Sequence, residues 1–136
     1  MKKISILLVL YSLNGQAFEL LVTGLRNNEG QVRCSVFKSE EGFPSDPKKA
    51  IIKISVNPQN NEALFDFKDL AEGDYAMALL HDEDENGEMR TNLIGLPREG
   101  WAVSNDAPPR MFGAPSFESA LKNWKKDEKA TVKMRY

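Results

Sequence analysis

Hydrophobic and polar residues alternate along much of the chain, the pattern of β-strands that have one face in a core. Successive side chains of a strand point to opposite faces, so a period of two separates a buried face from an exposed one. We expect the first two strands below to form a hairpin across the polar turn at residues 26–30. The alternation predicts strands around Phe18, Leu20 and Val22; Val32, Cys34 and Val36; Ile52, Ile54 and Val56; residues 64–67; and Val132, Met134 and Tyr136.

Residues 74–82 form the most apolar segment of the second half of the chain. Tyr75, Met77 and Leu79 fall on one side and Ala76, Ala78 and Leu80 on the other. Such a run favours a central strand that is covered on both faces. Helical spacing occurs at Phe117, Ala120, Leu121 and Trp124, after a candidate N-cap at Ser116.

These elements predict a mainly β fold: a single β-sandwich of Greek-key type, with at most one short helix near the C-terminus. Two irregular stretches are expected, one at residues 40–49 with Phe43 tucked against the core, and one at 91–115. Leu70, Gly73 and Tyr75 form a Leu-x-x-Gly-x-Tyr element. A tyrosine so placed can tie its hydroxyl back to the preceding turn. The element resembles that of transthyretin-like and collagen-adhesin B-type, immunoglobulin-like sandwich domains.

Residues 1–17 have the features of a cleavable secretory signal peptide. Lys2 and Lys3 precede an apolar run of about ten residues, which is shorter than the roughly twenty of a membrane-spanning helix. Small residues at Gly15 and Ala17 indicate cleavage before Phe18. The alternative is a buried N-terminal strand. We therefore expect a periplasmic or secreted protein whose residues 18–136 form one sandwich domain, with no transmembrane segment after cleavage.

Removal of residues 1–17 takes away two lysines and no acidic residue, so the formal net charge changes from −2 to −4. An acidic chain argues against nucleic acid as a partner, because nucleic-acid binding needs clustered basic residues. The lysines at 122–129 are interrupted by Asp127 and Glu128, which favours a solvated face. Cys34 is the sole cysteine, so no intramolecular disulfide can form. A buried, inert thiol fits its place in the strand pattern better than a reactive one.

An acidic loop follows the apolar strand and carries the candidate chemistry. Asp82, Asp84 and Asn86 stand at positions one, three and five of a calcium-type loop, with Gly87 at six. An EF-hand would need a glutamate at position twelve, where this chain has Leu93. A looser calcium site stays open, with further ligands from Glu88, Asn92, Asn105 or Asp106. The alternative is a metal-free loop in which Asn86-Gly87 forms a type I′ hairpin turn.

His81 is the sole histidine and lies at the end of the strand. It could act as a general base or a ligand-binding group. Asp82 is adjacent and should point to the opposite face, so the two do not form a ready catalytic pair. With no second histidine and no cysteine pair, zinc is not expected. We favour the other interpretation, in which His81 forms a hydrogen bond to the 91–115 segment.

Five segments of the chain are distinctive in combination: His81-Asp82-x-x-x-Asn86-Gly87, Thr91 to Trp101, Ser104-Asn105, Gly113 to Ala120 and Gly73 to Ala76. Together they resemble one family, the short exported bacterial proteins called domain of unknown function 2141. The resemblance extends from about Leu20 to the C-terminus. It implies a periplasmic or secreted sandwich domain without an established activity. Family members commonly have an acidic residue where this chain has Arg90, a charge that could pair with Asp82 or Asp84 in place of a metal.

Three functions compete on these features. We favour a non-catalytic binding module of the cell envelope for a sugar, peptide or protein, with His81, Glu99, Trp101 and Asn105 as candidate ligand-binding residues. Trp101 could instead plug the end of the sandwich. Exposure of Trp101, Met111 or Phe112 would support binding, and their burial would contradict it. The second is a calcium-stabilised structural or assembly domain. Whichever function holds, we expect a monomer or a weak homo-oligomer. A hydrolase using His81 is the third, and the chain has no recognisable nucleophile motif, so we expect no enzyme.

Overall fold

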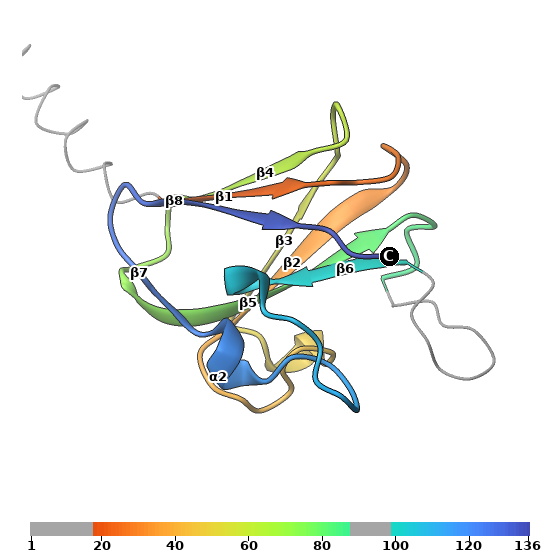
Figure 1. Cartoon of the computed structure of the whole chain (residues 1–136). Coiled ribbons are helices and arrows are strands. Elements are labelled where there is room, and N and C mark those ends of the chain that lie inside the picture. Colours follow the sequence, from red (N-terminus) through yellow and green to blue (C-terminus); the bar gives the residue numbers. More distant parts are fainter. Residues whose placement is uncertain (1–17, 88–98) are drawn as a thin grey trace, which may run out of the picture.

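The computed structural model describes residues 18–87 and 99–136, which form two packed β-sheets. Figure 1 shows the sheets as two layers, with the short helix α2 and two loops beneath the larger sheet. The mainly β sandwich that the sequence predicts is therefore confirmed. None of the helices in these residues has the length and apolar character needed to cross a bilayer. The predicted signal peptide, residues 1–17, lies outside the described residues.

The smaller sheet has the order β4-β1-β8 and the larger one the order β3-β2-β5-β6, with β7 paired to β5. All pairs are antiparallel except β1 with β8. The strands are β1 (Phe18–Thr23), β2 (Gln31–Phe37), β3 (Ile52–Val56), β4 (Ala63–Phe67), β5 (Gly73–Asp82), β6 (Gly100–Val103), β7 (Lys122–Trp124) and β8 (Lys129–Lys133).

The predicted hairpin of the first two strands is wrong. β1 pairs with β4 and β8 in the smaller sheet, whereas β2 pairs with β3 and β5 in the larger one. Both strands alternate as expected, and their apolar faces meet each other across the core instead of lying side by side. A period of two identifies the buried face of a strand but does not identify its neighbour.

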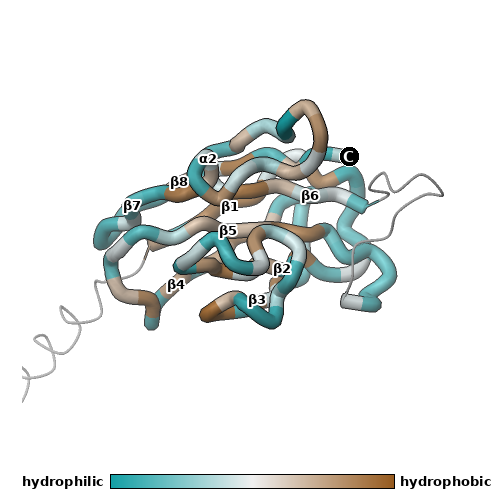
Figure 2. The backbone as a smooth tube through the Cα atoms, turned by 90° about the horizontal axis from the view of Figure 1, so that it is seen from below, coloured by the Kyte–Doolittle hydropathy of each residue, from teal (hydrophilic) through white to brown (hydrophobic). Residues whose placement is uncertain are grey.

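β5 is the central strand of the larger sheet and is buried along most of its length, as predicted. Tyr75, Met77 and Leu79 point into the core between the sheets. Ala76 and Ala78 point to the opposite face, into a second apolar cluster with Phe37, Val103, Ala107 and Ala120. Figure 2 shows hydrophobic positions along the strands in the middle of the molecule, around β1, β5 and β6.

Local sequence explains the covering of the second face. Phe43 packs edge-on against Phe37 at 5.4 Å between ring centroids, so it is tucked in as expected, although against the second cluster. The two 3-10 turns are η1 (Pro47–Lys49) and η2 (Ser104–Asp106). Helix α2 (Phe117–Ala120) has the predicted N-cap, since Ser116 accepts a bond from the amide of Ser119. It is shorter than the spacing suggested, because Trp124 belongs to β7.

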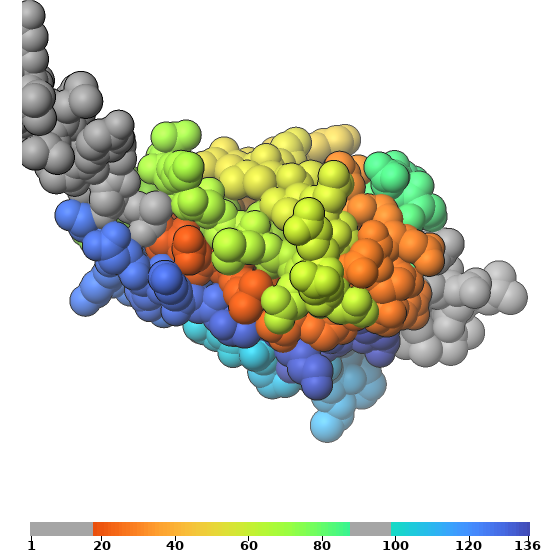
Figure 3. Space-filling view, turned by 90° about the horizontal axis from the view of Figure 1, so that it is seen from above, coloured from red at the N-terminus to blue at the C-terminus, as the bar shows by residue number. Residues whose placement is uncertain are grey.

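Tyr75 forms the predicted corner. Its hydroxyl donates to the carbonyl oxygen of Ala71 at 2.9 Å, which ties the start of β5 to the turn before it. Figure 3 shows the outer face of the smaller sheet, where the side chains of β4, β1 and β8 cover the core. After β8 the chain crosses to the larger sheet, where Arg135 pairs with Trp101 of β6. That crossing brings Tyr136 beside the end of β5.

Candidate functional site

His81 is the last core-facing residue of β5 and is fully buried. It follows Tyr75, Met77 and Leu79 in the alternation, so its ring points between the two sheets. Val32 is its neighbour on β2 and Gly100 its neighbour on β6. The side chain therefore caps one end of the apolar core.

Both ring nitrogens of His81 are hydrogen-bonded. Nε2 lies 2.8 Å from the carbonyl oxygen of Glu29, and Nδ1 lies 2.6 Å from the hydroxyl of Tyr136. A carbonyl oxygen can only accept, so Nε2 carries the proton and Nδ1 accepts from the tyrosine. The expected partner of His81 was the 91–115 segment. The observed partners instead come from the β1–β2 connection and the C-terminal segment.

Gly30 brings the carbonyl of Glu29 within reach of His81. Gly30 has a φ of 64°, and a Cβ there would lie 2.0 Å from the carbonyl oxygen of Asp82. Only a residue without a side chain allows the β1–β2 connection to lie this close to the end of β5. The connection is thereby held against the loop that follows His81.

Asp82 points to the opposite face of β5, as predicted, and is fully buried as well. Its Oδ2 accepts from Nε of Arg33 at 2.6 Å and from the amide of Gly87 at 2.7 Å. Its Oδ1 accepts from the amide of Asn86 at 3.1 Å. Arg33 of β2 pairs with Leu80 of β5. Leu80 and Asp82 lie on the same face of β5, so Arg33 is a diagonal neighbour of Asp82. The carboxylate thus holds the loop closed from inside.

The pKa of Asp82 lies below its ordinary value. Burial acts to raise it, but the Arg33 guanidinium, the Gly87 amide and a hydrogen bond with Asp84 together outweigh that effect. Glu83 also has a lowered pKa, first because it pairs with Arg26 and then through Asn27. Nε of Arg26 and Nδ2 of Asn27 donate to Glu83 at 3.1 and 2.7 Å. The acidic loop therefore carries ionised carboxylates that are partnered by neighbouring strands and turns.

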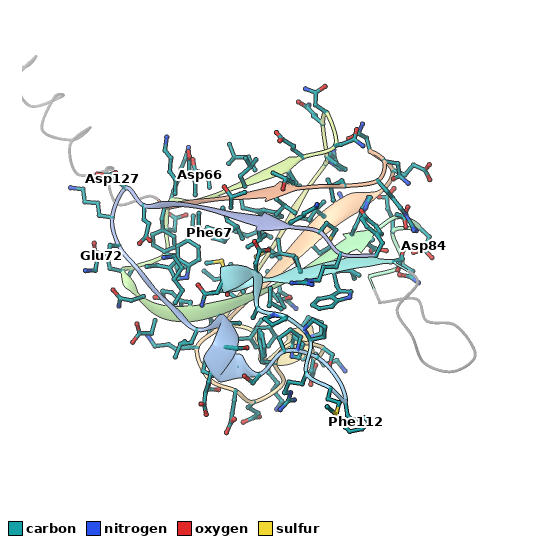
Figure 4. All side chains as sticks on the ribbon, viewed as in Figure 1. Asp66, Phe67, Glu72, Asp84, Phe112 and Asp127 are labelled. Carbon is teal, nitrogen blue, oxygen red and sulfur yellow. The ribbon has the colours of Figure 1, made fainter. Side chains whose placement is uncertain are left out.

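Glu99 joins the same cluster from the start of β6. Its side chain is fully buried, and Oε2 accepts from the amide of Glu83 at 3.0 Å. One carboxylate oxygen from each of Asp82, Asp84 and Glu99 lies within 4.8 Å of the others. Oxygen ligands at this spacing are compatible with a hard cation such as calcium. Figure 4 shows Asp84 at the rim of the fold, where the loop meets solvent.

Sequence comparison places most of the chain in one bacterial family. Residues 20–132 match the model of the family described as "Uncharacterized protein conserved in bacteria (DUF2141)". The chain belongs to this family. No curated protein and no solved structure matches it. Membership in DUF2141 confirms the resemblance seen in the sequence, and it brings no activity with it.

The candidate ligand-binding residues of this DUF2141 protein do not all meet. His81 and Glu99 lie at the same end of the larger sheet, and both are buried. Trp101 is half-buried on β6, with the Arg135 guanidinium 5.6 Å over its ring. Asn105 donates to the carbonyl oxygens of Ser119 and Leu121, at 3.2 and 2.9 Å, and so holds α2 in place. Glu88 and Asn92 lie outside the described residues.

The Asn86-Gly87 pair does not form the predicted type I′ turn. Positive φ angles occur at Glu85 (56°) and Gly87 (80°), and β5 pairs with β6 across the longer connection of residues 83–99. Arg90, for which we predicted an ion pair with Asp82 or Asp84, also lies outside the described residues. The observed cation beside Asp82 is Arg33, which sequence reasoning missed. Arg33 reaches Asp82 only because β2 pairs with β5 in this register. No local pattern in the sequence indicates that pairing.

Another surface feature of this DUF2141 protein is the turn at residues 110–113. The amide of Arg110 donates to the carbonyl oxygen of Gly113 at 3.0 Å, and Nε of Arg110 donates to that of Ala114 at 2.9 Å. Met111 and Phe112 at its tip are 90% and 91% exposed. Figure 4 shows Phe112 at the far end of this loop, beyond the larger sheet. The turn therefore presents two adjacent apolar side chains to solvent.

Proposed function

We propose that this is an exported cell-envelope protein that works as a non-catalytic binding module. The observation that carries the proposal is the exposure of Met111 and Phe112 on a braced turn. A lone exposed apolar side chain needs no explanation, but two adjacent large ones on a tip are typical of a contact surface. Methionine, phenylalanine and arginine are the residue types enriched in interface cores. Arg110, Met111 and Phe112 supply all three.

The surroundings of His81 support a non-catalytic role. A general base needs hydrogen-bond reach to a substrate proton. His81 is fully buried, and its two ring nitrogens are engaged by Glu29 and Tyr136. We therefore place the binding surface on the 110–113 turn and give His81 a structural role.

Photo-cross-linking in cells tests the binding surface. We would place a benzophenone amino acid at Phe112 and, as a matched control, at Leu64, which is 51% exposed on the outer face of β4. The expected result is a light-dependent adduct from position 112 that is absent from position 64. Equal labelling at both positions, or none at 112, would contradict the proposal.

Export is part of the proposal and has its own test. The residues of the 1–17 segment favour cleavage before Phe18. Mass spectrometry of the protein recovered from the periplasm or medium should give a chain that begins at Phe18. An intact N-terminus and a cytoplasmic location would contradict export. The binding surface has its own test in the cross-linking experiment.

Calcium binding is a second candidate, favoured by the convergence of Asp82, Asp84 and Glu99. Arg33 competes with it, because the guanidinium and two backbone amides already donate to the oxygens of Asp82. Thermal unfolding in chelator and then in calcium distinguishes a calcium site from a loop that Arg33 holds without metal. Calcium at a hundred times its dissociation constant would add about 2.7 kcal/mol to stability. Asp84→Asn, at an exposed position, should abolish that rise; no rise in the unsubstituted protein rejects the candidate.

A further inference from the structure

The exposed tip of the 110–113 turn has a defined shape and charge. Met111 and Phe112 project from a turn that is closed by backbone and side-chain hydrogen bonds of Arg110. Arg110 is the only charged residue between positions 107 and 115. The tip is therefore a convex apolar knob with one positive charge at its base. Because the turn is braced, little conformational freedom is lost when it is immobilised in a complex.

A hollow of complementary character lies elsewhere on the same chain. It has a volume of about 330 Å³, and its apolar lining consists of Ile52, Ile54, Phe67 and Leu70. Phe67 and Leu70 are buried, whereas Ile52 and Ile54 are half-buried against the core. The hollow is lined by residues of β3, the end of β4 and residues 68–70, so core side chains form part of its lining.

The rim of the hollow is acidic. Asp66, Lys68 and Asp69 supply its charged groups, and together they carry a net charge of −1. Lys68 lies 3.9 Å from Asp66, a distance that gives only a weak, exposed ion pair. A positively charged residue beside an apolar knob would find carboxylates at this rim. Both charge and polarity of the hollow thus complement the tip.

Knob and hollow cannot meet within one molecule. Figure 4 shows Phe112 beyond the larger sheet and Asp66 and Phe67 on the opposite side of the fold, at the smaller sheet. We propose that the 110–113 turn of one copy inserts Phe112 into the hollow between β3 and β4 of a second copy, with Arg110 beside Asp66 and Asp69. The partner of the proposed binding module is then another copy of the same chain.

The geometry of this contact determines the type of assembly. Two different patches meet, so the interface is head-to-tail, and each added copy leaves one knob and one hollow free. An interface made by one turn and one hollow is smaller than the 1,200–2,000 Å² or so of a stable complex. Assembly is therefore weak and concentration-dependent, which suits a protein gathered in an envelope compartment.

Disulfide trapping captures such a weak contact. In a Cys34→Ala background, one purified preparation carries Met111→Cys at the knob and a second carries Lys68→Cys at the rim. Leu64→Cys, also exposed and on β4, replaces Lys68→Cys in the matched control. On mild oxidation we expect the 111–68 dimer to form about tenfold faster than the 111–64 dimer, because docking raises the effective concentration of the two thiols.

Two further variants tie the effect to the proposed contacts. Phe112→Ser in the knob preparation should remove the difference between the two dimers. Arg110→Glu should slow formation of the 111–68 dimer. Asp69→Lys in the rim preparation should restore part of the rate by reversing both charges, while the bond from Arg110 Nε to Ala114 stays lost. Equal rates for the 111–68 and 111–64 dimers, or no effect of Phe112→Ser, would overturn self-association.

The proposal rests on the binding function of the same turn, and the two fail in distinguishable ways. If the benzophenone at position 112 captures a different protein while the 111–68 and 111–64 rates are equal, the binding module stands and self-association is overturned. If position 112 captures nothing and the rates are equal, both proposals are overturned. Capture of a second copy of the chain, together with the faster 111–68 dimer, supports both.

Discussion

The hydroxyl of Tyr136 lies 2.6 Å from Nδ1 of His81, although 55 positions separate the two residues in the sequence. The same hydroxyl accepts the backbone amide of Arg26 at 3.1 Å, and the Arg26 guanidinium lies 4.5 Å over the tyrosine ring. Three segments from different parts of the chain therefore meet at one phenol. The contact links the end of β5 to the segment after β8, which closes this end of the sandwich.

Tyr136→Phe should destabilise the fold by about 1–3 kcal/mol, because it leaves Nδ1 of His81 without the hydroxyl donor in a buried setting. The ring and its packing are kept, so the loss reports on the hydroxyl alone. The free energy of unfolding in urea measures it. A double-mutant cycle with His81→Phe should give a coupling energy of about 0.5–3 kcal/mol. Additive effects of the two substitutions would show that the contact contributes nothing.

The stability of the acidic loop should fall in acid. The pKa of Asp82 is lower in the folded chain than its ordinary value, so the unfolded chain binds more protons in the window between the two values. The contribution of Asp82 is fully present above its unfolded pKa of about 4 and is lost as the pH falls through the folded pKa. Glu83, also lowered, acts in the same direction. Urea unfolding at a series of pH values from 7 down to about 2 measures how steeply the free energy of unfolding falls with pH.

Arg33→Leu separates this effect from general acid unfolding. The variant removes the guanidinium beside Asp82, so it should lose about 1–3 kcal/mol at neutral pH and show a shallower acid slope. Lys68→Leu is the matched control, since the Lys68–Asp66 pair is exposed and should change stability by less than about 1 kcal/mol. An unchanged slope in Arg33→Leu would mean that the ion pair is not the source of the pH dependence.

Strand faces were predictable from the sequence because burial of one face is a local pattern. Phe18, Leu20 and Val22 are buried as the alternation indicates, and the Tyr75 corner forms as its local element suggests. Strand partners were not predictable in the same way. β1 has the polar turn of a hairpin after it, yet it pairs with β4 and β8. Pairing depends on long-range packing, which alternation does not record.

The candidate site shows the same division. The sequence pointed to Asp82 and Asp84 as parts of one acidic loop, and the structure keeps their carboxylates together with that of Glu99. His81 ends the core-facing side of β5, on the opposite face from Asp82. The sequence pattern alone could not identify Arg33, which reaches Asp82 from the neighbouring strand, or Tyr136, which reaches His81 from the end of the chain. These contacts need the register of the sheet. Strand β6 was also missed, since Gly100–Val103 is short and follows an irregular stretch.

Gly100→Ala should open the end of the sandwich. A Cβ at Gly100 would lie 2.6 Å from the Tyr136 ring and 2.7 Å from Met134, so both of these side chains must shift. Tyr136 is 46% exposed and can swing outward, at the cost of its bond to His81. We expect a loss of about 1–3 kcal/mol, the usual cost of overpacking. Gly73→Ala is the control, because its nearest atom, the Tyr75 hydroxyl, is 3.4 Å away. Equal losses in urea unfolding would argue against a specific clash at Gly100.

The Cys34 thiol should be unreactive in the folded protein. It is 1% exposed between Ile54 and Leu79, and burial raises its pKa, so the reactive thiolate is disfavoured. A thiol reagent should label it only through opening of the larger sheet, at least about a thousandfold more slowly than an exposed cysteine. Leu64→Cys in a Cys34→Ala background supplies that comparison on the same fold. The labelling rate of Cys34 should rise with urea in parallel with global unfolding. Fast labelling without denaturant would place the thiol at an accessible position and make it a candidate for intermolecular pairing.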